Sequence, residues 1–360
     1  MSSVGARPNR SGQEASASHL TAAEVKALEV KGKDGDLEAQ LQVATAYATG
    51  NGVAKDPSVS IEWYEAAARQ GSAIAQTSLG LAYMSGEGVE QDKATALAWY
   101  KKAARQNYPN ALYNLGTAYY NGDGVDVSDA KAYGWFLLAR EAGSKNAIDA
   151  VRRAEEELKA ETLIAGLKEV ARNYDRGDVL PRNETMAMKW WLEVAKKDDE
   201  DARIAVANKY LDGRGAPQDF SQARKWCEEA VKRSEAQRDP DARAFYCMGI
   251  ISEHGTGAEK DPRKAREWYE KAYKLRSAQG AKALARMYAS GEGGKVNRPE
   301  AWLLYFALFR SRDESVKPQL KELKGEMTHK EWGEVLKRLA VLHFGPEDID
   351  SLLAEDHSAK

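Results

Sequence analysis

One cysteine and one histidine have a spacing that could support nucleophilic catalysis. Cys247 and His254 are seven residues apart, which places them on one face of a helix, and Glu253 lies beside the histidine. A thiol activated by an imidazole needs contact between the two groups and a third group that orients the base. Two helical turns separate these residues by about 10 Å, so we expect no direct hydrogen bond. We therefore interpret Cys247 as a packed thiol and His254 as a helix-end residue.

The sequence contains no pattern that we expect to bind a metal or a cofactor. Its five histidines are dispersed, and none pairs with another at zinc-ligand spacing. The recurrent G-x-G elements lack the longer glycine patterns of nucleotide-binding loops, which favours helix ends. The carboxylate runs Glu155–Glu157 and Asp198–Asp201 could supply a glycosidase-like pair, but charged runs on helices are usually solvated. The sequence therefore predicts no catalytic residue, cofactor or metal, and no enzyme activity.

The composition disfavours two classes of partner. The chain has 360 residues, with 53 Lys and Arg against 55 Asp and Glu, and its net charge of −2 provides no positive field for a nucleic acid. The longest strongly apolar run, Ala301 to Phe309, is nine residues long, whereas a membrane-spanning helix needs about 20. We expect no membrane insertion. Two cysteines are too few for the disulfide framework of a small secreted domain, and the redox compartment stays open.

A repeat of 36 residues organises most of the chain. Tyr47, Tyr83 and Tyr119 are separated by 36 residues, and the same step separates Tyr174 from Tyr210. Every repeat also contains a glycine, and in the first six repeats a tryptophan follows that glycine by 13 residues. These glycines define repeats 1 to 7 in order: Gly50, Gly86, Gly122, Gly177, Gly213, Gly255 and Gly291.

Each repeat predicts two helices joined by a short loop. In repeat 2, Ala75, Leu79, Ala82 and Tyr83 recur at three- and four-residue steps, which forms one stripe of a first helix. The glycine ends that helix, and Asp-Pro pairs mark the start of the second helix in two repeats. The second helix carries an aromatic doublet that we assign to the core. The doublets are Trp63-Tyr64, Trp99-Tyr100, Trp135-Phe136, Trp190-Trp191 and Trp268-Tyr269.

The repeat pattern is specific enough to indicate a family. Repeat 2 carries it as Ala75, Leu79, Gly80, Tyr83, Gly86, Gly88, Val89, Asp92, Ala96, Trp99, Tyr100, Ala103 and Ala104. This pattern resembles the Sel1-like repeat, a relative of the tetratricopeptide repeat, and the resemblance covers Asp36 to about Leu308. It implies an all-α fold, an α-solenoid that forms a right-handed superhelix of about seven helix–turn–helix repeats with helical caps. Repeat 4 lacks the second glycine, repeat 6 has Ser252 at the tyrosine position, and repeat 7 has Leu304 at the tryptophan position.

The main break in the period lies between Tyr119 and Tyr174, where the spacing is 55, or 36 plus 19. A smaller break lies between Gly213 and Gly255, where the step is 42 and the polar stretch 234–239 can form a longer loop. The extra segment, 144–162, predicts a long amphipathic helix. The resemblance implies that such helices close a stack, so we expect two stacks, 36–162 and 163–310, or one continuous superhelix with an inserted helix. The flanking segments complete the expected organisation. They are a disordered arm at 1–20, a short helix at 21–35, and a helical cap with a tail at 311–360, in which Thr328 and Glu331 form a capping box and Pro346 bounds the last helix.

The resemblance also implies a binding surface, because the first helices of tetratricopeptide-like stacks line the concave side. The register predicts an inner row of side chains on these helices. In repeat 3 this row is Asn110, Tyr113, Asn114, Thr117, Tyr120 and Asn121. In repeats 4 to 7 it is Lys168, Arg172, Arg176, Asn208, Arg243, Tyr246, Lys282 and Arg286. Amides and tyrosines suit a peptide backbone, and arginines bind carboxylates in a two-pronged manner, so an acidic peptide would suit this surface.

These observations lead to one functional hypothesis and two alternatives. The first is a non-catalytic scaffold that binds a protein or peptide partner in the concave groove, in assembly or signalling. The alternatives are a self-associating structural framework and a periplasmic regulatory protein. The chain lacks an export signal, which makes the cytoplasm the default location and a periplasmic or secreted location the alternative for a mature chain. The oligomeric state stays open.

Overall fold

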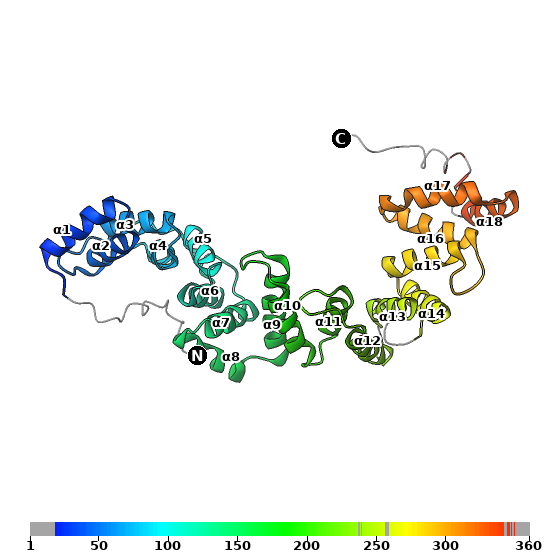
Figure 1. Ribbon diagram of the computed structural model, residues 1–360, viewed down its shortest axis with the longest axis horizontal. Helices are drawn as coiled ribbons and strands as arrows, with labels where there is room; N and C mark the ends of the chain where they lie inside the picture. Colours follow the sequence, from blue (N-terminus) through cyan, green and yellow to red (C-terminus); the bar gives the residue numbers. More distant parts are fainter. Residues whose placement is uncertain are drawn as a thin grey trace. The chain divides into compact units, whose positions relative to one another are not determined.

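The computed structural model describes residues 19–236, 238, 240–255, 259–341, 344, 345, 347 and 349. Within this part of the chain there are 18 α-helices, one short 3-10 helix and no strand, which confirms the all-α repeat fold (Figure 1). The expected arm at 1–20 falls almost entirely outside the described residues, as do Pro346, His343 and His357. The chain divides after Lys197 into two compact units.

Unit 1 is a stack in which consecutive helices pack on one another. Its last four helices depart from strict succession, because α9 packs on α7 as well as on α10, and α8 packs on α7. Its helices are α1 (Ala22–Lys33), α2 (Leu37–Thr49), α3 (Pro57–Arg69), α4 (Ala73–Ser85), α5 (Lys93–Ala104), α6 (Pro109–Asn121), α7 (Asp129–Glu141), α8 (Lys145–Glu157), α9 (Ala160–Arg176) and α10 (Glu184–Ala195).

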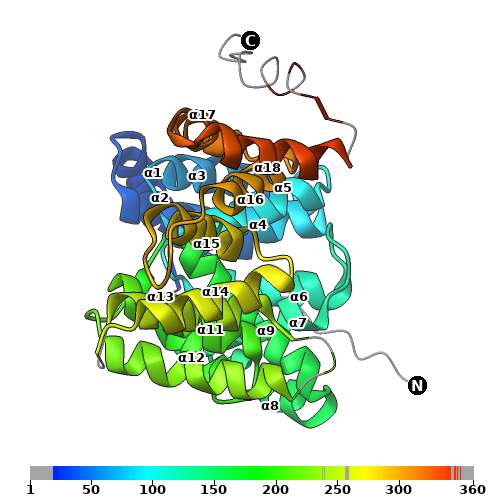
Figure 2. The ribbon, with the colours of Figure 1, turned by 90° about the vertical axis from the view of Figure 1, so that its right-hand side faces the viewer.

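Unit 2 continues the same succession of paired helices, and α13 and α14 lie side by side in both views (Figures 1 and 2). Its last repeat packs on a terminal helix pair. Its elements are α11 (Glu200–Asp212), α12 (Phe220–Glu235), α13 (Ala242–His254), α14 (Pro262–Lys274), α15 (Ala278–Ser290), α16 (Arg298–Arg310), a 3-10 helix (Glu314–Val316), α17 (Lys317–Glu326) and α18 (His329–Ala340).

The loop chemistry explains where the helices begin and end. Gly50 and Gly86 close α2 and α4 with φ of 78° and 74°, in the left-handed region that glycine tolerates best. The carboxylates of Asp56 and Asp92 then accept hydrogen bonds from the free amides that open α3 and α5. The left-handed glycine that ends a helix and the side-chain cap that opens the next helix both recur along the chain, which confirms the predicted helix–turn–helix unit.

A helical glycine brings the two helices of a repeat together. A Cβ atom on Gly116 of α6 would lie 2.6 Å from the ring of Phe136 on α7. Gly80 faces Tyr100, and Gly249 faces Tyr269, in the same way. Glycine at this position therefore lets an aromatic ring of the second helix rest directly on the backbone of the first helix.

The aromatic doublets do not behave as one class. The second residue of each doublet is buried, for example Tyr100 at 1% exposure. Trp135 and Trp190 are buried as expected, but Trp63, Trp99 and Trp268 are only half-buried. The assignment of every doublet tryptophan to the core is therefore wrong for these three. Trp99 and Trp268 instead lie at the edge of the stack, where Lys102 and Lys271 cover their rings.

The inserted segment forms a helix, but it does not close a unit. α8 is shorter than the extra segment, and it buries Ala147, Ala150 and Val151 against α7. α9, the first helix of repeat 4, also packs on α7, and its Gly166 lies against the backbone of α7 at Ala130 and Gly134. Repeat 4 therefore belongs to unit 1. The compact units divide after Lys197 rather than at the expected 162/163 boundary.

The C-terminal cap is anchored by a displaced tryptophan. Leu304 is buried at the usual tryptophan position of repeat 7, and Trp302, two residues earlier, is fully buried. The Trp302 indole N–H donates a hydrogen bond to the carbonyl of Leu320 on α17 over 3.0 Å. Thr328 and Glu331 form the capping box that opens α18, as the sequence predicted.

Candidate functional site

A groove of about 520 Å³ runs along repeats 1 to 3 in unit 1. Its floor and walls come from α3, α4 and the loop that follows α4, and its edges come from the end of α2, the start of α6 and Asp123. The residues that line it are Ala48, Thr49, Lys55, Pro57, Ser60, Ile61, Tyr64, Ile74, Thr77, Ser78, Leu81, Ala82, Met84, Ser85, Glu87, Gln91, Lys93, Tyr108, Asn110 and Asp123.

The groove uses the helix positions of the predicted inner row, but in repeat 2 rather than in repeat 3. Six lining residues of α4 stand 36 positions before the row residues of α6. They are Ile74, Thr77, Ser78, Leu81, Met84 and Ser85. The sequence does not mark these residues as a site, because their small and apolar side chains carry no obvious binding chemistry. The 36-residue displacement was the signal that could have found them.

The groove is electrically balanced, and several of its hydroxyl groups are satisfied within the protein. Ser60, Thr77 and Ser85 donate hydrogen bonds to backbone carbonyls over 2.8, 2.8 and 2.9 Å. Two ion pairs also line the groove. Lys55 pairs with Glu87 over 2.8 Å and Lys93 with Asp123 over 2.9 Å. The surface that remains available to a ligand is mixed, and its apolar part includes Ile74, which is 41% exposed.

In repeat 3 the structure separates the predicted row into buried and exposed residues. Tyr113, Asn114 and Thr117 are 6%, 2% and 2% exposed, and the Tyr113 ring packs on Phe136 with centroids 5.3 Å apart. These three side chains therefore cannot contact a partner in this conformation. Tyr120 and Asn121 are exposed at the end of α6.

The basic part of the inner row is distributed over both units. Lys168 and Arg172 are half-buried on α9 of unit 1, and Asn208 is half-buried on α11 of unit 2. Tyr246 is half-buried on α13, where its ring lies 5.6 Å from that of Tyr269. Partial burial raises the pKa of Tyr246, so its hydroxyl stays neutral.

The remaining cations of the row are ion-paired within unit 2. Arg243 bonds to Asp241 and to Asp201, each over 2.5 Å, and Lys282 lies 3.7 Å from Asp313. The hydrogen bonds that Arg243 donates to the Asp241 carboxylate raise the pKa of Arg243, so its guanidinium stays charged and paired. The expected basic groove is therefore largely neutralised at these positions by neighbouring carboxylates.

Arg286 is paired as well. It contacts Glu253 over 2.5 Å and Glu292 over 3.3 Å. Partial burial alone would lower its pKa, but the two carboxylates outweigh that effect and raise the pKa. Its guanidinium is therefore committed to acidic groups of the protein itself.

Cys247, which the sequence offered as a candidate nucleophile, is not a free thiol in this structure. Cys247 forms a disulfide with Cys227, so its interpretation as a packed free thiol is wrong. The bond joins α12 to α13, a contact between repeats that the helical spacing of Cys247 and His254 could not show. His254 ends α13 and is exposed, as predicted. Among the described residues, no group of three or more His, Cys, Asp or Glu could hold a metal ion.

Comparison with known proteins identifies the repeat. The Sel1 repeat family model matches seven segments, 37–72, 73–108, 109–144, 165–199, 201–234, 240–277 and 278–306. No curated protein sequence matches the chain. Within the described residues, none of the helices has the length and apolar character needed to cross a bilayer.

Solved structures of similar sequence are bacterial repeat proteins. The protective antigen c5321 of uropathogenic Escherichia coli, which displays an SLR fold, is 29% identical, with 91% of this chain and 73% of that chain covered and a TM-score of 0.43. A Sel1 repeat protein from Oxalobacter formigenes is 26% identical, with coverages of 84% and 80% and a TM-score of 0.37.

The family assignment rests on the seven matched segments, which span most of the chain from 37 to 306. The first match after the inserted α8 begins at 165, within α9, the first helix of repeat 4. Sel1 repeat proteins are generally protein-interaction scaffolds, and the family is generally non-catalytic. This chain belongs to the Sel1 repeat family.

Proposed function

We propose that this chain is a non-catalytic scaffold that binds an extended peptide segment of a protein partner in the groove of repeats 1 to 3, in assembly or signalling. The groove carries the proposal, because it combines apolar side chains of α4 with hydroxyl groups, those of Ser60 and Thr77, that already donate to backbone carbonyls. An extended segment could place one apolar side chain on Ile74 and Leu81 while its backbone runs along the edges, where Asn110 lies.

The partner's anchor is apolar in this proposal rather than acidic. The ion pairs of Arg243, Lys282 and Arg286 argue against a free basic surface in unit 2, since a carboxylate ligand would have to displace an internal one. The groove of unit 1 balances its two lysines with Glu87 and Asp123. Complementarity therefore favours a neutral segment with an aliphatic or aromatic anchor.

A displayed library of random peptides tests this proposal. The full chain is used for selection, and the enriched peptides are measured against the variants Ile74→Glu and Leu81→Glu. The matched control is Ile148→Glu, which places the same change at a side chain 56% exposed on α8, outside the groove. We expect enriched peptides to share an apolar residue and to lose at least tenfold in affinity with either groove variant but not with the control.

Two results would contradict the proposal of an apolar peptide anchor in this groove. Acidic peptides that ignore Ile74→Glu but lose affinity with Arg172→Glu would move the site to the basic inner row. A selection that enriches no peptide above background would remove the peptide-binding proposal altogether. Circular dichroism of each variant shows whether the helices are retained.

We also propose that the protein works in an oxidising compartment, such as the periplasm or the extracellular space, rather than in the cytoplasm. The disulfide supports this location, because the cytosol keeps most protein thiols reduced. Trapping thiols with a maleimide in intact source cells, before lysis, tests it. Two free thiols at Cys227 and Cys247 in those cells would instead return the protein to the cytoplasm.

A further inference from the structure

One buried position is aromatic in every repeat except the fifth. It lies 14 residues after the glycine that defines each repeat, on the second helix, and it is buried in all seven repeats. Its occupants are Tyr64, Tyr100, Phe136, Trp191, Cys227, Tyr269 and Tyr305. Cys227 is therefore the one small side chain at a position that a ring otherwise fills.

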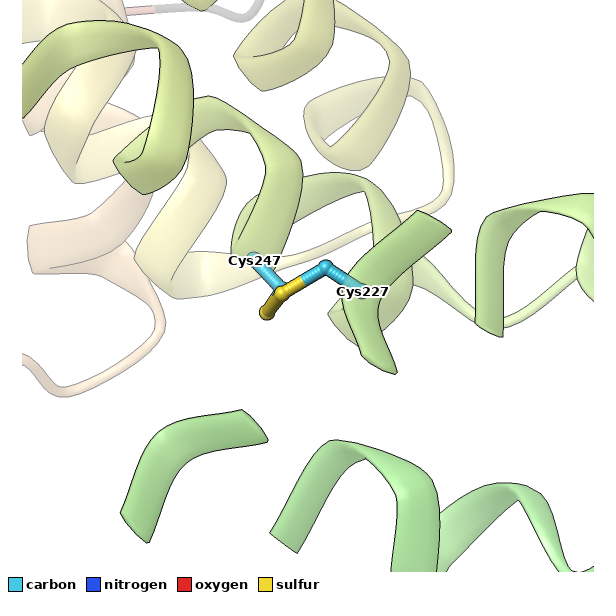
Figure 3. Close-up of a disulfide and its surroundings, with 2 residues drawn as sticks. All are labelled: Cys227 and Cys247. Carbon is cyan, nitrogen blue, oxygen red and sulfur yellow. A yellow bond between two sulfur atoms is a disulfide. The ribbon is translucent and has the colours of Figure 1, made fainter. Parts of the chain in front are cut away.

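The disulfide stands where that ring is missing. It joins Cys227 of α12 in repeat 5 to Cys247 of α13 in repeat 6, with Cα atoms 5.8 Å apart, within the range of disulfides (Figure 3). The two residues are 0% and 1% exposed. Cys247 occupies the register position of Ser78, which lies with Tyr64 along the groove at the junction of repeats 1 and 2. The cystine thus stands where the junction of repeats 1 and 2 has Tyr64 and Ser78.

The surroundings of the bond combine small and large apolar side chains. The buried residues of α12 and α13 around it include Ala223, Ala230 and Ala244, which are small, and Phe245, Met248 and Ile251, which are large. A hydrogen bond from the backbone amide of Asp241 to the hydroxyl of Ser234 also joins the end of α12 to the start of α13. Two reduced thiols would fill less space than the ring found at this position in the other repeats and would restrain neither helix, so the disulfide adds a covalent restraint to an otherwise noncovalent junction.

We propose that the Cys227–Cys247 disulfide is a redox-sensitive staple of the junction between repeats 5 and 6. Oxidised, it fixes α12 on α13. A dithiol reductant opens it in two steps. One reductant thiolate attacks one cysteine sulfur, forms a mixed disulfide with it and releases the other cysteine as a thiolate; the second reductant thiolate then attacks the reductant's sulfur in that mixed disulfide and releases the first cysteine. The protein gains two electrons and two protons, and the reductant becomes a disulfide. Because both sulfurs are buried, the reaction follows local opening of the junction.

Amide hydrogen exchange of the full chain tests the proposal. The oxidised protein is compared with protein reduced by dithiothreitol, and the helices of unit 1, α4 and α5, serve as the internal control. A disulfide that closes a loop of 20 residues is expected to slow opening by a factor of about 10 to 100. We therefore expect α12 and α13 to exchange about 10 to 100 times faster after reduction, and α4 and α5 to be unchanged.

Two double variants distinguish the effect of the disulfide bond from the effect of the cysteine side chains. Cys227→Ser with Cys247→Ser is expected to exchange like the reduced protein under both conditions. Cys227→Tyr with Cys247→Ser restores the pair found at Tyr64 and Ser78, and it is expected to exchange more slowly than the double serine variant and to ignore the reductant. If either variant fails to fold, the wild-type comparison still decides.

The proposal fails if oxidised and reduced wild type exchange at equal rates in α12 and α13. It also fails if non-reduced protein, denatured under oxidising conditions, takes up two maleimides per chain, because the bond would then not exist. A rate increase shared equally by α4 and α5 would show a general effect of the reductant and would likewise overturn it.

Discussion

Arg286 of α15 donates a hydrogen bond to Glu253 of α13 over 2.5 Å. Tyr269 of α14 donates to the other oxygen of the same carboxylate over 2.8 Å. One glutamate, 9% exposed, thus connects three successive helices of repeats 6 and 7. The arginine that the sequence places in a binding groove is therefore a partner of a buried acid, and its first role is to compensate that charge.

Removal of Arg286 is expected to destabilise unit 2. Arg286→Ala leaves the Glu253 carboxylate with Tyr269 and without its cation, at an expected cost of about 1–2 kcal/mol, since the arginine is half-exposed and partly screened. Adding Glu253→Gln is expected to recover part of the loss. Urea unfolding followed by circular dichroism of the four chains in this cycle gives the coupling free energy.

The control is Arg172→Ala on α9, a half-buried arginine of the inner row. It makes no ion pair with a described residue, and we expect its free energy of unfolding to stay within about 0.5 kcal/mol of wild type. Equal losses for both arginines, or a coupling free energy near zero for Arg286 and Glu253, would contradict the structural role of Arg286.

The helical glycine beneath each ring gives a second prediction. Gly116→Ala places a methyl group 2.6 Å from Phe136, so helices α6 and α7 must separate, at a cost of about 1–3 kcal/mol. Gly333→Ala on α18 is the control, because nothing lies within 4 Å of its added Cβ, and it should stabilise its helix by about 0.5–1 kcal/mol. Urea midpoints that move in the same direction for both variants would refute the packing argument.

The fold could be predicted from the sequence because its determinants are local and periodic. Gly86 ends a helix and Asp92 opens the next one through contacts within a few residues, and a 36-residue period repeats both. The exposure of the inner-row side chains was harder to predict, since the register gives the helix face on which a side chain lies but not which neighbouring side chains cover it. Tyr113 is buried, whereas Ile74, the α4 counterpart of Asn110, is exposed along the groove.

The pairings of the site depend on contacts between repeats, which no local spacing reveals. Arg286 and Glu253 are 33 residues apart, and Arg243 and Asp201 are 42 residues apart. Cys227 and Cys247 are separated by 20 residues. This spacing does not mark neighbours on one helix, and it differs from the 36-residue period of the repeat. The missing ring at Cys227 was visible in the sequence, but its partner became visible only when α12 and α13 were packed together.

Alkaline pH is expected to unfold the protein through its tyrosines. Burial, followed by the hydrogen bond to Glu253, raises the pKa of Tyr269, and burial raises the pKa of Tyr100. An unfolded tyrosine titrates near pH 10. The stabilisation from the neutral hydroxyls is therefore complete below about pH 10 and is lost as the pH rises toward the folded-state pKa, by about 1.4 kcal/mol per pH unit for each such group.

Tyr269→Phe removes one of these groups and is expected to reduce the pH dependence of stability above pH 10. Tyr120→Phe, at a side chain 44% exposed, is the control and should leave the pH dependence unchanged. Urea midpoints measured across the alkaline range, together with tyrosinate absorbance, give both slopes. If Tyr269→Phe and wild type lose stability with equal slopes, Tyr269 does not carry the proton linkage.

The C-terminal cap is expected to depend on Trp302, because this side chain is fully buried among α16, α17 and α18. Its ring stacks on Phe306 with centroids 5.0 Å apart and meets the edge of Trp332 at 5.3 Å, and its N–H binds the carbonyl of Leu320. Trp302→Ala should cost about 3–5 kcal/mol, and Trp302→Phe should cost about 1–2 kcal/mol, mainly through the unpaired carbonyl. Limited trypsin digestion should then release α17 and α18 first from the alanine variant, since an end helix pair has neighbours on one side only. Digestion of the alanine variant that begins instead in unit 1 would show that the tryptophan does not hold the cap.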